Sequence, residues 1–159
     1  MFLNKNYTQA SVAFTRAGWS REAAICDAYL LREKARSIST TASTARTQAF
    51  VAAANAFITC ARDSLPKQVN ERLAYYEAAG GCYSEARDLK NAGDKYRTAQ
   101  QYAAAARTYR DGGCFDEMVE VITRHGNALD SGLVERLTTD AKMHYFEVPS
   151  NGWLSAKSV

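Results

Sequence analysis

Proline and glycine are scarce in this chain of 159 residues, which has two prolines and nine glycines. Aromatic residues make up only 11% of it. Alanine is instead the most frequent residue within its 47% hydrophobic content. Alanine has the highest helix propensity, whereas β-branched and aromatic residues favour strands. The composition therefore excludes a collagen and a disordered chain, and it predicts an all-α protein.

Long apolar runs are absent as well. No stretch reaches about 18 consecutive apolar residues, the length that indicates a membrane-spanning helix. Residues 1–6 lack the charged segment and following apolar segment of a signal peptide. We therefore expect a soluble intracellular protein, cytoplasmic or nuclear, with no membrane partner.

Cysteine and histidine are too few and too dispersed for a metal site. The four cysteines lie far apart in the sequence with no CxxC pair, whereas zinc ligands cluster. We expect no metal and no cofactor, and reduced cysteines that pack as small hydrophobic residues. His125 and His144 have no catalytic partner at a defined spacing, so the sequence predicts no enzyme. The cysteines are Cys26, Cys60, Cys82 and Cys114.

Charge is unevenly spread along the chain. The net charge is +3, with 10 basic and 6 acidic residues in 1–80 and 10 basic and 11 acidic in 81–159. Arg32, Lys34, Arg36 and Arg46 form a local basic region. This bias is weaker than the basic stripe of a dedicated nucleic-acid binder. Nucleic acid is therefore the less favoured partner, and solvated helix charges are the simpler interpretation.

An internal repeat organises the second half of the chain. Tyr76 recurs as Tyr109 and Cys82 recurs as Cys114, in similar strings and at nearly the same offset. Residues 89–112 match the large, small, small, aromatic, alanine, aromatic, small pattern of the tetratricopeptide repeat (TPR). The matching residues are Leu89, Ala92, Gly93, Tyr96, Ala105, Tyr109 and Gly112. In such hairpins a small residue on one helix admits an aromatic side chain of the next.

We predict a right-handed α-solenoid of about four TPR-like hairpins, with Gly18, Pro66 and the pairs 80–81 and 112–113 ending helices. The repeat domain spans residues 1–146, with a Ser/Thr-rich linker or frayed helix end near 37–47 and an irregular tail over 147–159. The repeat tyrosines are expected in the core rather than stacked on bases. The eight predicted helices are 5–17, 20–36, 44–63, 67–79, 83–97, 100–111, 115–125 and 130–145.

Several strings carry a family resemblance. They are REAAICDAYLLREKAR (21–36), AFVAAANAFITCA (49–61), YYEAAGGCYSEA (75–86), YRDGGCFDEMVEVI (109–122) and HYF (144–146). On these strings, residues 11–146 resemble the helical-repeat segment of large TPR-and-ankyrin-repeat proteins, including fungal members with a UvrD-like helicase module. The resemblance implies a fragment or accessory module of a helicase-like protein. It carries over no ATPase activity, because the chain has no GxxxxGK[ST] string.

The candidate binding residues are Arg87, Lys90, Asp94 and Arg97, which recur at helical spacing in the predicted helix 83–97. In a TPR register this polar face lines the concave groove, where repeat proteins hold peptides. We therefore predict a non-catalytic scaffold that binds a partner peptide or domain, with an acidic segment facing the basic residues. The alternative for these side chains is that they are ordinary solvated charges paired along the helix.

Two other functions remain open at this stage. The first is an accessory nucleic-acid-binding segment of a helicase-like protein. The second is a structural packing module without a ligand, whose exposed solenoid ends would promote self-association. Asp116 and Glu117, at the start of a predicted helix, are expected to stabilise its N-terminus rather than to act in acid-base catalysis.

Overall fold

The computed structural model describes residues 2–146, with side chains described from residue 6 onward. This part of the chain is all α-helical, as predicted. The predicted tail, 147–159, lies outside the described residues. The helices are α1 (Phe2–Arg16), α2 (Ser20–Ser37), α3 (Ser43–Arg62), α4 (Val69–Glu85), α5 (Leu89–Thr98), α6 (Tyr102–Asp111), α7 (Phe115–His125), the short 3-10 helix η1 (Gly126–Ala128) and α8 (Ser131–Tyr145).

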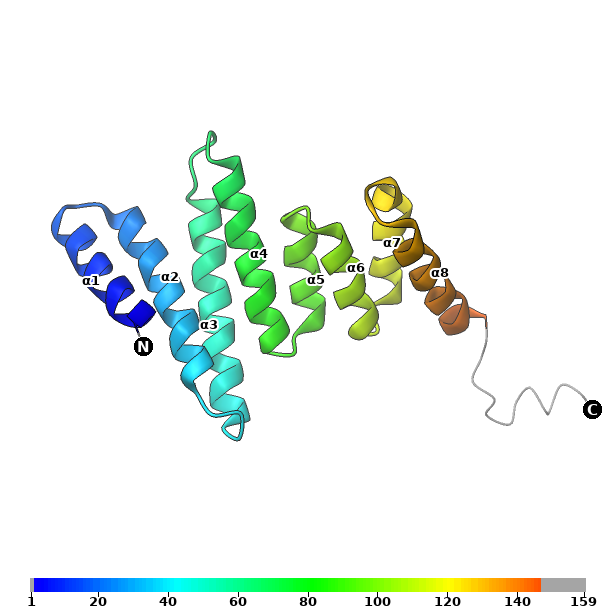
Figure 1. Cartoon of the computed structure of the whole chain (residues 1–159), viewed down its shortest axis with the longest axis horizontal. Coiled ribbons are helices and arrows are strands. Elements are labelled where there is room, and N and C mark those ends of the chain that lie inside the picture. The colour runs from blue at the N-terminus through cyan, green and yellow to red at the C-terminus, as the bar shows by residue number, and fades with distance from the viewer. Residues whose placement is uncertain (1, 147–159) are drawn as a thin grey trace, which may run out of the picture.

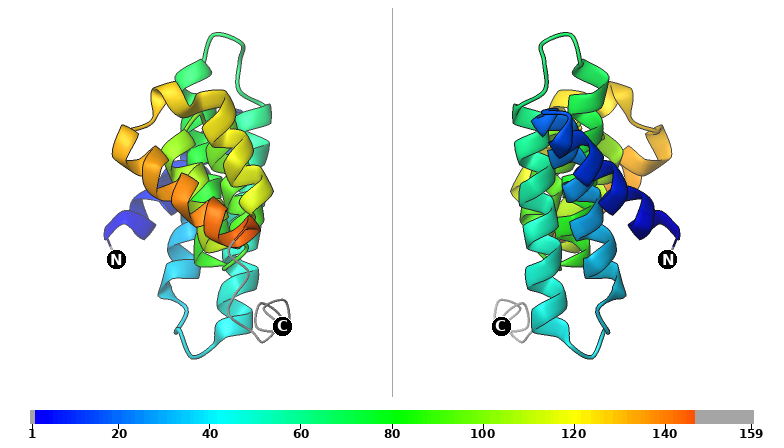
Figure 2. Two further views of the ribbon diagram at one scale, coloured as in Figure 1. Left: turned by 90° about the vertical axis from the view of Figure 1, so that its right-hand side faces the viewer. Right: turned by 90° about the vertical axis from the view of Figure 1, so that its left-hand side faces the viewer.

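The helices form a row in chain order, and each one packs against the next. Figure 1 shows this row from α1 at one end to α8 at the other, and Figure 2 views it along its length. Only α8 departs from the simple order, because it packs on both α6 and α7. None of the described helices has the length and apolar character needed to cross a bilayer.

Two clusters of buried side chains fill the row. The first joins α2, α3, α4 and the beginning of α5, with Phe50 and Phe57 at its centre. The second joins α6, α7 and α8 around Tyr109, Met118 and Leu137. Tyr96 on α5 packs against both clusters. From α2 to α8 the core thus runs along the row instead of being gathered at one centre.

Four of the helix connections are built alike, with three residues whose middle one is in the left-handed region. Its φ is +77° at Gly18, +62° at Arg87, +60° at Gln100 and +71° at Gly113. In each turn the middle N–H donates to the carbonyl three residues back, and the next N–H to the carbonyl five residues back. This pair of bonds defines the Schellman motif, which ends a helix and satisfies its last carbonyls.

The turns also give the repeat its length. The middle residues Arg87, Gln100 and Gly113 follow one another at equal steps along the chain. Tyr83, Tyr96 and Tyr109, each of which lies one helical turn before a middle residue, follow the same step. In this stretch the repeating unit is therefore one helix with its turn, which is shorter than the step from Tyr76 to Tyr109 used in the sequence analysis.

The predicted break at Gly80 and Gly81 is wrong, because α4 runs through both glycines to Glu85. Gly80 is instead a contact point: a Cβ there would lie 3.0 Å from the Tyr96 ring. Gly93 has the same role, since a Cβ there would lie 2.5 Å from the Tyr109 ring. The breaks at Gly18, Pro66 and residues 112–113 are confirmed.

The Ser/Thr-rich segment is shorter than the predicted 37–47. Helix α2 extends to Ser37 and α3 begins at Ser43, which leaves residues 38–42 between them. Arg46 of α3 closes this connection, because its Nη1 donates to the carbonyls of Arg36 at 3.1 Å and Ile38 at 2.6 Å. A cationic donor at a helix C-terminus satisfies carbonyls that have no partner inside the helix.

Candidate functional site

The four predicted binding residues are divided between two elements. Lys90, Asp94 and Arg97 lie on α5 and share one face of it at helical spacing. Arg87 lies in the turn before α5, because the predicted helix 83–97 does not exist as one helix. Its side chain is exposed. The structure therefore brings three of the four residues together on a helix face and places the fourth beside it.

The charges on this face of α5 are already paired within the chain. Lys90 donates to a carboxylate oxygen of Glu117 on α7. Arg97 Nη1 lies 3.1 Å from Glu120 Oε2, also on α7. Tyr109 donates its hydroxyl proton to Asp94. A partner that bound here would have to compete with these contacts.

Ionisation on this face follows from the same contacts. The hydrogen bond and charge of Glu117 raise the pKa of Lys90, and the Lys90 ammonium in turn lowers the pKa of Glu117. Burial, and then the hydrogen bond to Asp94, raise the pKa of Tyr109. All three shifts favour the paired forms, so the face acts as a cross-link between α5 and α7.

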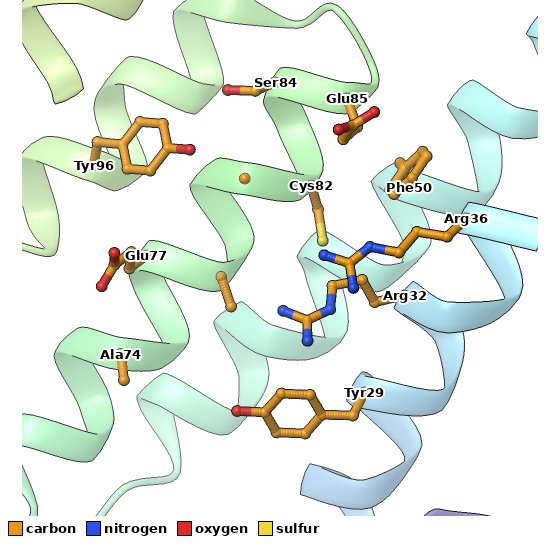
Figure 3. Close-up of a pocket in the computed structure, with 12 residues that line it drawn as sticks. Tyr29, Arg32, Arg36, Phe50, Ala74, Glu77, Cys82, Ser84, Glu85 and Tyr96 are labelled. Atoms are coloured by element: carbon orange, nitrogen blue, oxygen red, sulfur yellow. The ribbon is translucent and has the colours of Figure 1, made fainter. Parts of the chain in front are cut away.

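A separate cleft of about 530 Å³ lies between α2 and α4 (Figure 3). Its apolar surface includes Phe50 of α3 and Ala78 and Cys82 of α4, while Tyr96 of α5 closes one side. Its volume is in the range of about 300–1,000 Å³ that is typical of ligand sites, although its walls present more polar than apolar surface. The polar side chains that line it are Tyr29, Arg32, Arg36, Glu77, Ser84 and Glu85.

Arg32 is the most constrained polar residue in this cleft. Its guanidinium carbon lies 5.0 Å from the Tyr29 ring centroid and 5.5 Å from that of Phe57, which are cation–π distances. Its Nε is buried and has no hydrogen-bond partner among the described residues. The nearest carboxylate oxygen, on Glu33, is 3.6 Å away, too far for a hydrogen bond.

A buried donor without an acceptor costs roughly 1–3 kcal/mol. Arg32 therefore keeps an unsatisfied bonding capacity in the cleft wall. The other basic residues differ: Arg36 donates to Glu33 at 2.6 Å, and Arg46 lies 3.7 Å from Glu85 while binding the end of α2. Lys34 is exposed and does not line the cleft. The basic region of the sequence thus separates into residues with different roles.

Cys82 lies beside the two arginines, as Figure 3 shows, and is 1% exposed. Burial raises the pKa of its thiol to about 11, although Arg32 and Arg36 act in the opposite direction. At neutral pH the sulfur is therefore protonated, and a protonated thiol is a weak nucleophile and a poor metal ligand. Among the described residues, no group of three or more His, Cys, Asp or Glu side chains could hold a metal ion.

The opposite side of the cleft is acidic. Glu77 of α4 is exposed and makes no ion pair among the described residues. In Figure 3 it lies on the side of Tyr96, across the cleft from Arg32 and Arg36. The cleft therefore presents basic groups from α2 along one side and a carboxylate from α4 along the other.

Other residues singled out in the sequence have packing roles. His125 ends α7 and stacks on Tyr102 with ring centroids 3.7 Å apart. His144 stacks on Phe115 at 4.2 Å. Asp116 is in the first turn of α7, as expected, and accepts a hydrogen bond from Tyr145. The core role expected for the repeat tyrosines holds fully for Tyr109, which is 0% exposed.

Comparison of the chain with known proteins gives no match among protein-family models, curated proteins or solved structures.

Proposed function

We propose that this chain is a non-catalytic protein-interaction module, whose α2–α4 cleft holds a segment of a partner protein. The observation that carries the proposal is the guanidinium of Arg32, which lines an open cleft and makes no hydrogen bond among the described residues. Apolar side chains and charged groups of both signs surround it. A peptide segment offers both kinds of complement.

The row of helices suits this function. Helices that pack in chain order, joined by repeated short turns, support the proposal that the chain is a right-handed α-solenoid of TPR-like hairpins. Such arrays present long surfaces on which alternate helices flank a partner. Here α2 and α4 flank the cleft while α3 contributes Phe50 between them.

We place the partner in the cleft rather than on the α5 face that the sequence pattern indicates. Lys90 and Arg97 are engaged by Glu117 and Glu120, whereas Arg32 lies 3.6 Å from Glu33 without a hydrogen bond to it, and its Nε has no acceptor among the described residues. Desolvating an existing ion pair on binding carries a cost that filling an empty acceptor position does not. The α5 face then serves mainly to hold α5 and α7 together.

The family resemblance supports the proposal that the chain is an accessory module of a larger helicase-like protein. The genomic sequence on either side of this segment tests that context. Direct nucleic-acid binding is less well supported by the cleft, because Glu77 and Glu85 would repel a phosphate backbone. Single-strand affinity that fell steeply with salt would favour nucleic acid instead.

A peptide selection tests the proposed function. A random linear heptapeptide library displayed on phage is selected against the chain, and binders are synthesised with a fluorophore. Variants with the photo-crosslinker p-benzoylphenylalanine at Ala74, an exposed cleft residue, or at Arg107, exposed on α6, then receive the peptides. We expect crosslinks from position 74 and not from 107. Failure to select peptides, or crosslinking from 107 alone, would contradict the proposal.

A further inference from the structure

The charge arrangement of the cleft specifies the chemistry of its occupant. Resting on the proposed function, we propose that the α2–α4 cleft selects a peptide segment with a carboxylate side chain for Arg32 and a basic side chain for Glu77. The acidic end of the segment then lies against α2 and its basic end toward Tyr96 of α5.

The side chain of Arg32 is preorganised for a carboxylate. The contacts with Tyr29 and Phe57 fix the guanidinium plane, so little side-chain freedom remains to be lost on binding. The two terminal N–H groups of a guanidinium also point in parallel and match the two oxygens of a carboxylate. Nε is buried, so the two Nη groups of this 23% exposed side chain, which make no hydrogen bond among the described residues, are the donors open to such a pair.

Glu33 does not already fill this role. Its Oε1 is 3.6 Å from Arg32 Nε but only 2.6 Å from Arg36 Nη1, so its hydrogen bond goes to Arg36. Arg36 lies one helical turn after Arg32 and also lines the cleft. It can supply a second donor to the same incoming carboxylate, which accepts up to about four hydrogen bonds.

The far side of the cleft decides the orientation of the segment. Glu77 is the cleft carboxylate without an ion pair among the described residues, since Glu85 lies 3.7 Å from Arg46. A basic side chain of the partner pairs with Glu77, and an acidic one is repelled. Between the two ends, the half-buried Ala78 contacts apolar parts of the segment, and the buried Phe50 and uncharged Cys82 thiol lie beneath.

A carboxylate fits this cleft better than a phosphate group. A phosphorylated side chain carries a charge of about −1.5 to −2 near neutral pH. Glu33 contacts both arginines, and Glu85 and Glu77 also line or face the cleft, so a doubly charged group meets more repulsion than a carboxylate does. The arrangement therefore indicates an aspartate or glutamate of the partner.

The test measures the affinity of the selected heptapeptides by fluorescence polarisation. We expect each cleft-crosslinking peptide to carry Asp or Glu, and Arg32→Gln to weaken binding by about tenfold or more. Arg32→Lys keeps the charge but removes the planar guanidinium with its parallel donors, so we expect a similar loss. Arg36→Gln, at a half-exposed side chain, is the milder second variant. Arg107→Gln is the control and should change affinity less than about twofold.

Reversal of charge tests the orientation. Glu77→Lys should weaken the selected peptides, and replacing their basic residue with Glu should restore affinity to this variant. Helicity by circular dichroism is recorded for every variant. If Arg32→Gln does not fold, the affinities of Arg36→Gln and Glu77→Lys decide whether the cleft selects an acidic and a basic side chain.

Each outcome separates the two proposals. The proposed charge selection is overturned, and the proposed function left intact, by two results. One is peptides that crosslink at position 74 but lack an acidic residue. The other is peptides that bind Arg32→Lys and Arg36→Gln as tightly as the natural chain. Tighter binding after Asp is replaced by phosphoserine also overturns the charge selection in favour of a phosphate group. Absence of any cleft-binding peptide overturns both.

Discussion

At the scale of single residues, the packing of α4, α5 and α6 depends on glycines that face tyrosine rings. Gly80 meets Tyr96 and Gly93 meets Tyr109, and the two pairs have the same separation in the sequence. The tyrosine of one helix thus occupies the space left by the missing side chain on the preceding helix. This contact turns a residue with poor helix propensity into a stabilising one.

Gly93→Ala should therefore destabilise the protein. The new Cβ would lie 2.5 Å from the fully buried Tyr109 ring, and overpacking of this kind costs about 1–3 kcal/mol. Gly126→Ala is the matched control, because nothing lies within 4 Å of its Cβ position and its φ is −55°. We expect urea denaturation to show a loss for the first variant and no loss for the second. Equal stability of both would contradict the packing account.

Tyr109 also makes the stability of the protein depend on pH in the alkaline range. Burial and the hydrogen bond to Asp94 raise its pKa above the ordinary value of 10.0. Because the folded state holds this proton more tightly than the unfolded state, its contribution to stability is constant below about pH 10 and is lost progressively above it. Tyr109→Phe should flatten this decline and cost about 1 kcal/mol at neutral pH.

The measurement for Tyr109 is the free energy of unfolding between pH 7 and 12. Tyr102→Phe provides the comparison, since Tyr102 stacks on His125 instead of binding a carboxylate. An unchanged alkaline slope in Tyr109→Phe would show that other groups, such as Tyr75 and Tyr83, set this pH dependence.

At the scale of elements, the turns rather than the helices carry the repeat. Gly18 and Gly113 take left-handed conformations at no steric cost, whereas Arg87 and Gln100 adopt the same conformation with a side chain. The hydrogen bonds of the Schellman motif are the same in all four turns. The helix boundaries are therefore set by this motif even where glycine is missing.

Substitutions in the turns should act in opposite directions. Arg87→Gly and Gln100→Gly should each stabilise the protein by about 0.5–1 kcal/mol, because they relieve the left-handed strain. Gly113→Ala should destabilise it by about 1 kcal/mol for the converse reason. Thermal unfolding of the three variants checks these signs. A lower melting temperature for both glycine variants would mean that the side chains of Arg87 and Gln100 make contributions larger than the strain.

The helix class and most helix ends could be predicted from the sequence, because alanine content and glycine or proline positions act locally. The two glycine pairs show the limit of such reasoning. Gly112 and Gly113 end α6, while Gly80 and Gly81 lie inside α4. The difference comes from Tyr96, which packs on Gly80 from another helix and is invisible to a local pattern. The turns at Arg87 and Gln100 lack the glycine that would have revealed them.

At the scale of the whole molecule, sequential packing makes stability vary along the row. Helices α3 and α4 each pack between two neighbours, whereas α1 packs mainly on α2. In a linear array the end elements lose fewer contacts when they open. Native-state hydrogen exchange should therefore show the greatest protection in α3 and α4 and the least in α1. Uniform protection across these helices would indicate one cooperative unit instead.

The candidate site could be found only from the packing of the whole molecule. Arg32 and Arg36 are recognisable in the sequence as basic residues one helical turn apart. Only the packing of α2 and α4 on α3 brings Cys82 beside them and Glu77 to the opposite side of the same cleft. The sequence pattern indicates a binding face for the charges of α5, with pairing along the helix as the alternative. Their own partners, Glu117 and Glu120, lie on α7, beyond the whole of α6, so this pairing could not be read locally.

The central claim is that the α2–α4 cleft receives the partner through Arg32. The most direct measurement is a titration of ¹⁵N-labelled protein with a selected peptide, followed through the Arg32 Nε–H signal and the backbone amides. We predict that the Arg32 signal and the amides of Gly81, Cys82 and Ser84 shift and saturate together, while Lys90 and Arg97 remain unchanged. An unperturbed Arg32 signal, with the largest shifts on α5 and α7, would contradict the account.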